Sequence, residues 1–577
     1  MANQRVLGTR RIWLPGVVMG LLAAVIVARL VELQVIEHER YAEQAREELQ
    51  GSSTELARRG AIVDRNGHAF ATSVDTWDIY VNVQAWTDPD AADRAANELA
   101  PAIGRDPGEL KHEVLESGLI DTIVARGVDY ETGRDLIDEH PPGVIALPNT
   151  TRVHPEGDLA AGLIGIFGMD NVGLSGIEAG LNDELHGQPG QAIFERDTAG
   201  EPIPFGQYVA TESIPGKDIV LTIDRYLQRL AEQTLAEAIE RHEAAGGTVV
   251  MMEPDTGEVL AMANEPSLKF SNLNLLEPGQ VELMRNPAVT DMYEPGSVMK
   301  VITAAAALDA GMINPDTTYT DTGSVDIYDV SIRNWDYRTY GEETMTGVLQ
   351  HSINTGSVFM ADLLGADRFH SYLDAFGFSE PTGSELPGEA SGFFRRPDDP
   401  GWSPVDLATQ SFGQGINVTP LQMTSAFAAT INGGKLLQSR FVKAHVNPNG
   451  EREDARPNVI GEPISEQTSA TMRRMLEDVV HPDWHSVAEP QYYRAGGKSG
   501  TANIPVPGEE YDDAQVASYI GFAPVDDPKI VILVKLDDNA DRLTGTQAAG
   551  PVFAELVDAS LSYLNVPPDA AQYTEAR

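Results

Sequence analysis

The N-terminus carries a single unbroken run of hydrophobic positions. No charged residue occurs from Ile12 to Ala28, and the segment from Ile12 to Val31 is 20 residues long. As a helix, such a segment spans about 30 Å, which is the thickness of a bilayer core. Arginines precede the run at positions 5, 10 and 11. This positive charge predicts that residues 1–11 are cytoplasmic, that residues 12–31 cross the cell membrane once, and that the remainder is extracytoplasmic.

The same run could also belong to a cleaved signal peptide. The apolar core of a signal peptide is about 7–15 residues long and is followed by an A-x-A type cleavage site. The present run is longer, and no such site follows it. The sequence therefore favours a retained anchor.

After residue 215, short apolar runs alternate with helical patterns. Between the apolar runs at 219–223 and 248–252, apolar residues repeat with a helical period from Leu227 to Ile239. Asp224, just before them, is a suitable N-cap for this helix. A last amphipathic helix is predicted to begin at Pro551. Strands at both ends of a long helical middle indicate an α+β domain over residues 216–566, in which helices flank one antiparallel sheet. The predicted strands are 219–223, 248–252, 259–263, 516–522 and 530–536.

Residues 32–215 give weaker patterns. Asn66-Gly67, between two short apolar runs, predicts a hairpin turn. Nothing between residues 34 and 215 shows a complete catalytic set. We interpret residues 32–215 as an extended, mixed pedestal domain of the dimerisation type, and residues 567–577 as a frayed tail.

Composition restricts the possible functions. The 577 residues include 41 Lys+Arg and 87 Asp+Glu, a net charge of −46, which argues against nucleic acid as a partner because phosphate binding needs clustered cations. The absence of cysteine excludes disulfides, thiol nucleophiles, iron–sulfur clusters and cysteine-type zinc sites. The 42% hydrophobic content is that of a globular protein.

The candidate chemistry comes from three short motifs that each occur once, in order. The chain has nine lysines; only Lys300 has a serine three residues before it, Ser297, and only Lys498 is followed by Ser/Thr and then Gly. Between them, Ser352 and Asn354 form the chain's one S-x-N motif. Each motif alone is weak, but their joint presence in this order indicates a serine acyltransferase site.

Each motif has a separate chemical reason. Ser297 is predicted to open a helix over residues 298–310, so that Lys300, three residues on, can reach the Ser297 hydroxyl and take its proton. This requires a lysine pKa lowered by burial or by a cationic neighbour, for which Lys498 is the candidate. Ser352 can relay a proton, and Asn354 can orient a substrate amide.

The third motif is predicted to bind substrate at a sheet edge. Gly496-Gly497 suits a strand that another backbone approaches closely, so a peptide could add there as an extra strand. The substrate-binding segment is Ser499, Gly500 and Thr501, where Lys498, Ser499 and Thr501 would hold a terminal carboxylate.

Further segments extend the pattern along the chain. They are R-G-A-I-V-D-R-N-G (59–67), R-V-H-P-E-G (152–157), G-L-S-G-I-E (173–178), L-T-I-D (221–224), Y-E-P-G-S-V-M-K (293–300), S-I-N-T-G (352–356), F-G-Q-G-I-N-V-T-P-L-Q (412–422), K-S-G-T-A (498–502), Y-I-G-F-A-P (519–524) and G-P-V-F (550–553). With these segments the chain resembles the class B penicillin-binding proteins, which are peptidoglycan D,D-transpeptidases, and most of all their FtsI-like cell-division branch.

The resemblance implies a fold, a reaction and partners. The C-terminal domain would have the serine β-lactamase-like penicillin-binding fold, and Ser297 would form an acyl-enzyme with stem peptides ending in D-Ala-D-Ala or with β-lactams. The backbone N–H groups of Ser297 and Thr501 would form the oxyanion hole. No cofactor and no metal are implied. The partners would be an FtsW-type glycosyltransferase and other divisome proteins.

Some positions depart from the family pattern. Val298-Met299 stand where Thr-Phe is usual, Ile353 takes the middle place of S-x-N, His154 replaces a tyrosine, and the segment after Pro266 differs. None of these changes removes a reacting group.

Several alternatives stay open at this point. They are an elongation-type transpeptidase, a β-lactamase or carboxypeptidase that uses water as acceptor, and a β-lactam sensor or scaffold without transpeptidation. A zinc site at His481 and His485 is disfavoured by Pro482 between them, and Asp537, Asp538 and Asp541 fit a solvated loop better than a calcium site.

Overall fold

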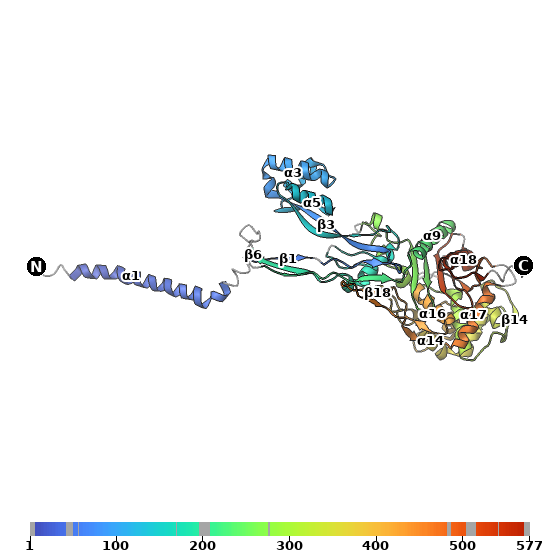
Figure 1. Ribbon diagram of the computed structural model, residues 1–577. Helices are drawn as coiled ribbons and strands as arrows, with labels where there is room; N and C mark the ends of the chain where they lie inside the picture. The colour runs from blue at the N-terminus through green and yellow to red at the C-terminus, as the bar shows by residue number, and fades with distance from the viewer. Residues whose placement is uncertain are drawn as a thin grey trace. The chain divides into compact units, whose positions relative to one another are not determined.

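The computed structural model describes residues 6–41, 50–55, 57–168, 170–195, 208–274, 277–481, 486–503, 515–540 and 542–569. The chain divides into two compact units, shown with the whole chain in Figure 1. One unit comprises residues 1–58 and 187–215, and the other comprises residues 59–186 and 216–577.

The first unit contains the N-terminal helix and a small sheet. Helix α1 (Val6–Val31) continues into one π-helical turn, Glu32–Ile36. From Pro15 to Ile36 this helix is long and apolar enough to cross a membrane, in agreement with the predicted segment 12–31. The sheet has the order β1 (Gln50–Glu55), β6 (Gly190–Glu195), β7 (Tyr208–Thr211).

The second unit begins with the predicted hairpin. Strands β2 (Ile62–Val63) and β3 (Ala69–Asn82) pair antiparallel, and the Asp64 N–H donates to the His68 carbonyl across the turn at 2.7 Å. A sheet of order β19-β18-β8-β2-β3-β4, in which β5 also pairs with β3, continues from this hairpin. Its other strands are β4 (Asp121–Asp129), β5 (Val144–Val153), β8 (Asp218–Leu221), β18 (Val442–Val446) and β19 (Arg452–Asp454).

Short helices cover part of this sheet. Ile79 of β3 packs with Trp86, Leu99, Leu110 and Leu136 in a separate small core. The helices are α3 (Pro89–Ala102), α4 (Pro107–Glu116) and α5 (Tyr130–Glu139), and further along the chain α6 (Ala161–Ile164), α7 (Gly176–Gly180) and α8 (Asn182–Leu185).

A five-stranded antiparallel sheet of order β10-β9-β23-β22-β21 forms the centre of the C-terminal region. All four predicted strands from 248–536 belong to it. The strands are β9 (Gly246–Met252), β10 (Val259–Glu265), β21 (Gly496–Asn503), β22 (Gln515–Ala523) and β23 (Ile530–Asp537).

Both faces of this sheet are buried, so its central strands are mostly apolar. On one face, Val249 and Met251 pack with α9 (Arg225–His242) and α18 (Gly545–Tyr563). On the other face, Val250 and Met252 join the core that contains α11 (Met299–Asp309) and α16 (Pro420–Ile431). Figure 1 shows α9 and α18 together on one side of the domain, and α16, α17 and α14 on the other.

The remaining elements fill the helical middle. The helices are α10 (Pro287–Thr290), α12 (Met345–Gln350), α13 (Asn354–Leu364), α14 (Ala366–Ala375), α15 (Pro404–Ser411) and α17 (Glu466–Val480). The short strands are β11 (Thr318–Asp321), β12 (Ser324–Ile327), β13 (Val330–Arg333), β14 (Gly341–Thr344), β15 (Phe393–Phe394), β16 (Ile416–Asn417), β17 (Leu436–Leu437) and β20 (Val459–Gly461).

The prediction that the last helix begins at Pro551 is wrong. Helix α18 begins at Gly545, because Thr544 and Gln547 form a capping box that fixes the first turn. Pro551 lies inside the helix, where its missing N–H leaves one backbone hydrogen bond unmade. The capping signal at Thr544 therefore outweighs the preference of proline for a first turn.

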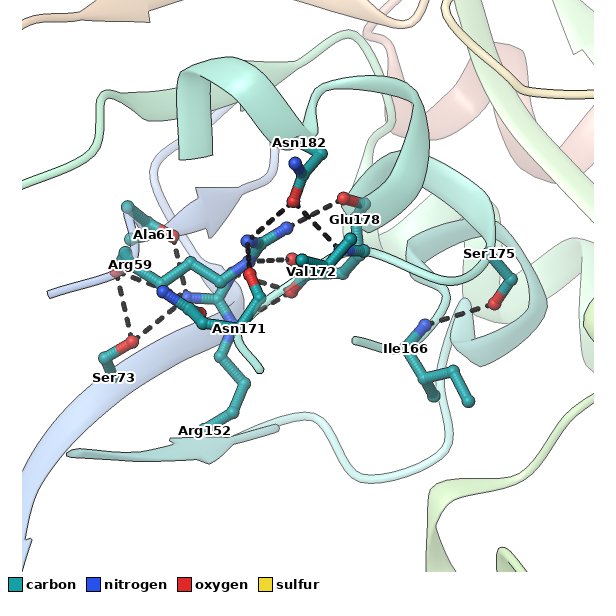
Figure 2. Close-up of polar contacts among 12 residues, drawn as sticks. Arg59, Ala61, Ser73, Arg152, Ile166, Asn171, Val172, Ser175, Glu178 and Asn182 are labelled. Carbon is teal, nitrogen blue, oxygen red and sulfur yellow. Dashed lines mark hydrogen bonds and ion pairs between the residues drawn. The ribbon is translucent and has the colours of Figure 1, made fainter. Parts of the chain in front are cut away.

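Three buried charges link the segments of the pedestal (Figure 2). The Glu178 carboxylate of α7 accepts from Arg59 Nε at 2.5 Å and from Arg152 Nε of β5 at 2.9 Å. All three side chains are at most 3% exposed. The arginines also donate to backbone carbonyls, Arg59 to Asn171 O and Arg152 to Gly60 O. The network thus fastens the segment before β2, strand β5 and helix α7 to one another.

Replacing Glu178 by glutamine is expected to destabilise the protein by about 3–5 kcal/mol, because two arginines would stay buried without their counter-charge. The measurement is the midpoint of thermal unfolding, with Glu98→Gln on the exposed face of α3 as control. Equal midpoints for Glu178→Gln and Glu98→Gln would contradict this account of the pedestal.

Candidate active site

Ser297 lies on a single 3₁₀ turn, Gly296–Val298, that runs directly into α11. Its neighbours Gly296 and Val298 are buried, whereas Ser297 is half-buried. Gly296 has φ +55°, and a Cβ there would lie 2.8 Å from the Thr501 carbonyl oxygen. Glycine is therefore needed at position 296 for this turn to pack against strand β21. The predicted helix over 298–310 is confirmed to within one residue at each end.

Lys300 lies one turn further along α11 and is completely buried. Its Nζ donates to Ser352 O at 2.6 Å, to Ser352 Oγ at 3.2 Å and to Asn354 Oδ1 at 2.7 Å. We predicted contact with Ser297 Oγ. Within the described part of the chain, no hydrogen bond joins Lys300 Nζ to Ser297 Oγ, and the three hydrogen bonds of the amine go to the S-I-N segment, residues 352–354. The first and second motifs are thus joined through Lys300.

Two causes lower the pKa of Lys300. Burial is the larger, because an ammonium loses its hydration in the core, and the positive charge of Lys498 acts in the same direction. Together they hold the pKa of Lys300 well below its usual value. Both causes were expected from the sequence. A lysine in this state can be neutral near neutral pH and can accept a proton.

The S-I-N segment connects α12 to α13 and has an uncommon backbone. Ser352 has φ +56°, in the left-handed region that a serine rarely adopts. Ile353 is completely buried, which anchors the segment in the core. Asn354 is the first residue of α13, and its Nδ2 donates to Arg333 O at 2.8 Å. This hydrogen bond fixes the amide so that Oδ1 faces Lys300.

The third motif lies on β21, at the end of the five-stranded sheet, as predicted. Lys498 is 2% exposed, and burial lowers its pKa to about 7. Its Nζ donates to the Ser499 carbonyl at 3.1 Å. Thr501 Oγ1 accepts from the Gly545 N–H at 3.1 Å, which ties β21 to the start of α18. The structure thus brings all three motifs to one place.

The glycines of β21 lie where neighbouring groups approach the strand closely. A Cβ at Gly496 would lie 2.4 Å from the Phe522 ring, and one at Gly497 would lie 2.8 Å from the Tyr519 ring. These two glycines therefore admit side chains of β22, and a Cβ at Gly497 would also lie 2.9 Å from the Ile520 carbonyl oxygen. A further close backbone approach occurs at Gly500, where a Cβ would lie 2.6 Å from Pro295 O. The addition of a peptide strand at this edge of the sheet stays a prediction.

The sequence did not reveal that the loop after β13 supports the S-I-N segment. Trp335 Nε1 donates to the His351 carbonyl at 3.3 Å, and the Tyr340 ring stacks on the His351 ring with centroids 5.0 Å apart. Both residues belong to the loop that follows β13. The only signal in the sequence is a cluster of aromatic residues, which has no chemical motif of its own.

The described residues contain no group of three or more His, Cys, Asp or Glu side chains that could hold a metal ion. His481 Nδ1 lies 3.0 Å from Glu489 Oε1, and Asp537 pairs with Lys535. His485 and Asp541, the other members of the two metal sites considered, lie outside the described residues.

Comparison with known families identifies the arrangement. Residues 247–558 match the penicillin binding protein transpeptidase domain, and residues 54–221 match the penicillin-binding protein dimerisation domain. The chain belongs to the class B penicillin-binding proteins. It is therefore an enzyme of the peptidoglycan D,D-transpeptidase family, with the α+β fold predicted from the sequence.

Named class B relatives cover nearly the whole chain. Stage V sporulation protein D of Bacillus subtilis is 31% identical over 94% of this chain and 84% of its own length. Peptidoglycan D,D-transpeptidase FtsI of Escherichia coli is 30% identical over 95% of this chain and 90% of its own length. The crystal structure of penicillin binding protein 3 from Mycobacterium tuberculosis, complexed with aztreonam, is 28% identical, with a TM-score of 0.69 over 89% of this chain and 98% of that one.

Two of the departures from the class B pattern contact each other. The His154 ring stacks on the Phe270 ring, with centroids 3.6 Å apart and an interplanar angle of 11°. Burial, reinforced by the positive charge of Arg152, lowers the pKa of His154 to about 4. His154 is thus a neutral aromatic ring at neutral pH, as the usual tyrosine would be, and the altered segment after Pro266 supplies its stacking partner.

Proposed function

We propose that this class B penicillin-binding protein is a cell-division D,D-transpeptidase that forms an acyl-enzyme at Ser297. The observation that carries the proposal is the buried Lys300 amine, which is held between Ser352 and Asn354 one turn after Ser297. A neutral amine in this place can activate a serine that would otherwise be a poor nucleophile.

In the acylation step, Lys300 takes the proton of the Ser297 hydroxyl, and Oγ attacks the carbonyl carbon of the penultimate D-Ala of a stem peptide. The backbone N–H groups of Ser297 and Thr501 stabilise the oxyanion. The bond to the terminal D-Ala then breaks, and its amine leaves with a proton passed on through Ser352. A β-lactam acylates Ser297 by the same attack, with opening of its ring.

In the second step, an amine of a neighbouring stem peptide attacks the acyl-enzyme and gives up a proton, which Ser352 passes to the neutral Lys300. Oγ of Ser297 leaves and regains a proton from Lys300, and the new amide bond is the cross-link. Asn354 orients the substrate amide in both steps. The donor peptide lies along the edge of β21 as an added strand, where Lys498, Ser499 and Thr501 hold its carboxylate.

The division role rests on resemblance. Y-E-P-G-S (293–297) is like the division branch, and two relatives bear the names FtsI and Stage V sporulation protein D. A second segment of this kind, residues 196–203, lies outside the described residues. We propose a single-pass membrane protein with residues 1–11 in the cytoplasm, a pedestal over 32–215 and a transpeptidase domain over 216–566. Its partners would be an FtsW-type glycosyltransferase and other divisome proteins.

The role is tested by locating a fluorescent fusion in growing cells and by depleting the protein. A septal signal, and filaments after depletion, would support the division role. A signal along the side wall, and rounded cells, would support the elongation role.

The reaction is tested with the purified full chain, a stem peptide ending in D-Ala-D-Ala and an acceptor amine. Release of D-Ala together with a cross-linked product would support transpeptidation. Release of D-Ala with water as the sole acceptor would indicate a carboxypeptidase instead.

The rate of acylation by penicillin is expected to fall as pH rises above about 7. Lys498 holds the penicillin carboxylate only while it is protonated, and its pKa of about 7 means that the cationic fraction declines from there upwards. The measurement is the second-order acylation rate from pH 6 to 9. In Lys498→Arg the guanidinium keeps its charge, so the decline should disappear. A wild-type rate that did not change over this range would contradict the role given to Lys498.

A further inference from the structure

A buried carboxylate, Asp321, lies behind the S-I-N segment at the end of β11. It is 1% exposed and accepts hydrogen bonds from Thr355 Oγ1 at 2.6 Å and from the Tyr340 N–H at 2.7 Å. Asn334 Nδ2 and the Gly323 N–H also donate to it, at 2.9 and 3.0 Å. Four donors thus converge on one carboxylate, which is a fully satisfied buried polar group.

Asp321 is ionised in this environment. Burial by itself would raise the pKa of its carboxyl, but the hydrogen bonds from Thr355, Tyr340 and Gly323 more than compensate and hold the pKa below its usual value. An ionised carboxylate only accepts hydrogen bonds. It therefore suits a place where all the neighbours are donors.

The donors lie on both sides of the catalytic motif. Thr355 directly follows Asn354 in α13, and its own N–H donates to Asn334 Oδ1 at 3.3 Å. Tyr340 is held by Asp321 through its backbone and stacks on His351, which directly precedes Ser352. Asp321 therefore contacts Thr355, which follows the motif, and supports His351, which precedes it, through the stacked ring of Tyr340.

The loop after β13 completes this support. Arg333 O accepts from Asn354 Nδ2, and Trp335 Nε1 donates to His351 O. Asn334, between these two residues, donates to Asp321. Three consecutive residues thus join Asp321 to both ends of S-I-N.

The backbone of Ser352 shows why such support is needed. Its φ of +56° is costly for a serine and persists only where the surroundings impose it. In this conformation both the carbonyl and the Oγ of Ser352 accept from Lys300 Nζ. A shift of the segment by about 1 Å at such a site can cost about 10²-fold in rate.

We propose that Asp321 is a positioning residue, which holds Ser352 and Asn354 against Lys300 through Thr355 and through the 333–340 loop. The proposal rests on the proposed function, because it assigns Asp321 to the acylation of Ser297. Asp321 touches none of the reacting groups described above, and it acts by fixing the acceptors of the Lys300 amine.

The test is the acylation of the full chain in detergent by a fluorescent penicillin, measured as the limiting rate and the half-saturating concentration. Asp321→Asn keeps the size of the side chain, but its amide NH2 group would face groups that are themselves hydrogen-bond donors. Thr355→Val removes one donor to Asp321, and Thr355→Ser keeps the hydroxyl. Asp326→Asn, an exposed carboxylate on β12 of the same region, is the matched control.

We expect Asp321→Asn and Thr355→Val to lower the limiting rate by about 10–100-fold, with a much smaller change in the half-saturating concentration. Thr355→Ser and Asp326→Asn should stay within about threefold of the wild type. The rescue by serine separates positioning from a general loss of structure, and melting curves establish that each variant is folded. If Asp321→Asn does not fold, the proposal is tested by comparing the limiting rates of Thr355→Val and Thr355→Ser.

The proposal is overturned if the folded Asp321→Asn and Thr355→Val variants acylate at the wild-type rate, even with lowered melting temperatures. It is also overturned if Thr355→Ser is as slow as Thr355→Val. A wild type that forms no adduct at all would overturn the proposed function instead, so the two failures are distinguishable.

Discussion

Replacing Lys300 by methionine is expected to lower the rate of acylation by penicillin by about 10²–10⁴-fold, the range for loss of a general base. Methionine fills a similar volume without an amine, so Ser297 would keep its place but lose the group that takes its proton. Methionine leaves Ser352 O and Asn354 Oδ1 without the lysine donor, so a melting curve establishes that the variant is folded. The measurement is the second-order rate of adduct formation by stopped flow or gel fluorescence.

Lys300→Arg is the informative control for charge. Arginine keeps a positive charge at this position but stays protonated at every accessible pH, so it cannot act as a base. We expect Lys300→Arg to be as slow as Lys300→Met. An arginine variant with near wild-type rate would show that Lys300 supplies only charge, and the base would have to be another group.

Replacing Ser297 by alanine is expected to abolish cross-linking, with no product above background. Without the hydroxyl there is no atom at the start of α11 to carry the acyl group, and the residual effect of the oxyanion hole cannot transfer an acyl group to an amine. The readout is formation of the cross-linked product and release of D-Ala by the full chain in detergent. Ser371→Ala, an exposed serine of α14, is the control for the substitution itself.

Loss of both products in Ser297→Ala, with full activity in Ser371→Ala, is the predicted result. If Ser297→Ala still released D-Ala at a substantial fraction of the wild-type rate, Ser297 would not be the nucleophile. The same variant tests the scaffold alternative in cells, because a scaffold without catalysis would tolerate the alanine.

The sequence predicted the parts of the fold that depend on local periodicity. The strand pair 516–522 and 530–536 and the helix behind Asp224 occur as expected, because alternating or helical apolar patterns reflect burial directly. The start of α18 was misplaced, because a proline is a more visible signal than a capping box. The pairing of strands from distant parts of the chain, such as β8 with β2, has no local signature in the sequence.

The candidate site was predicted for a different reason. Reactive residues at fixed spacing can be read from a sequence, and the structure brings together the three motifs that contain the eight predicted residues, whose roles stay predictions. The partners of Lys300 could not be predicted, because its reach to Ser352 and Asn354 depends on how α11 and α13 pack. Asp321 was missed because a buried carboxylate is recognised only by the donors that surround it.

The central claim is that Ser297 is the residue that becomes acylated. The most direct test is the intact mass of the full chain after incubation with a penicillin, followed by peptide mapping of the modified site. The account predicts a mass increase of one penicillin per chain, located on Ser297, stable for many minutes and absent from Ser297→Ala. A folded wild type that gains no mass, or an adduct that persists in Ser297→Ala, would contradict it.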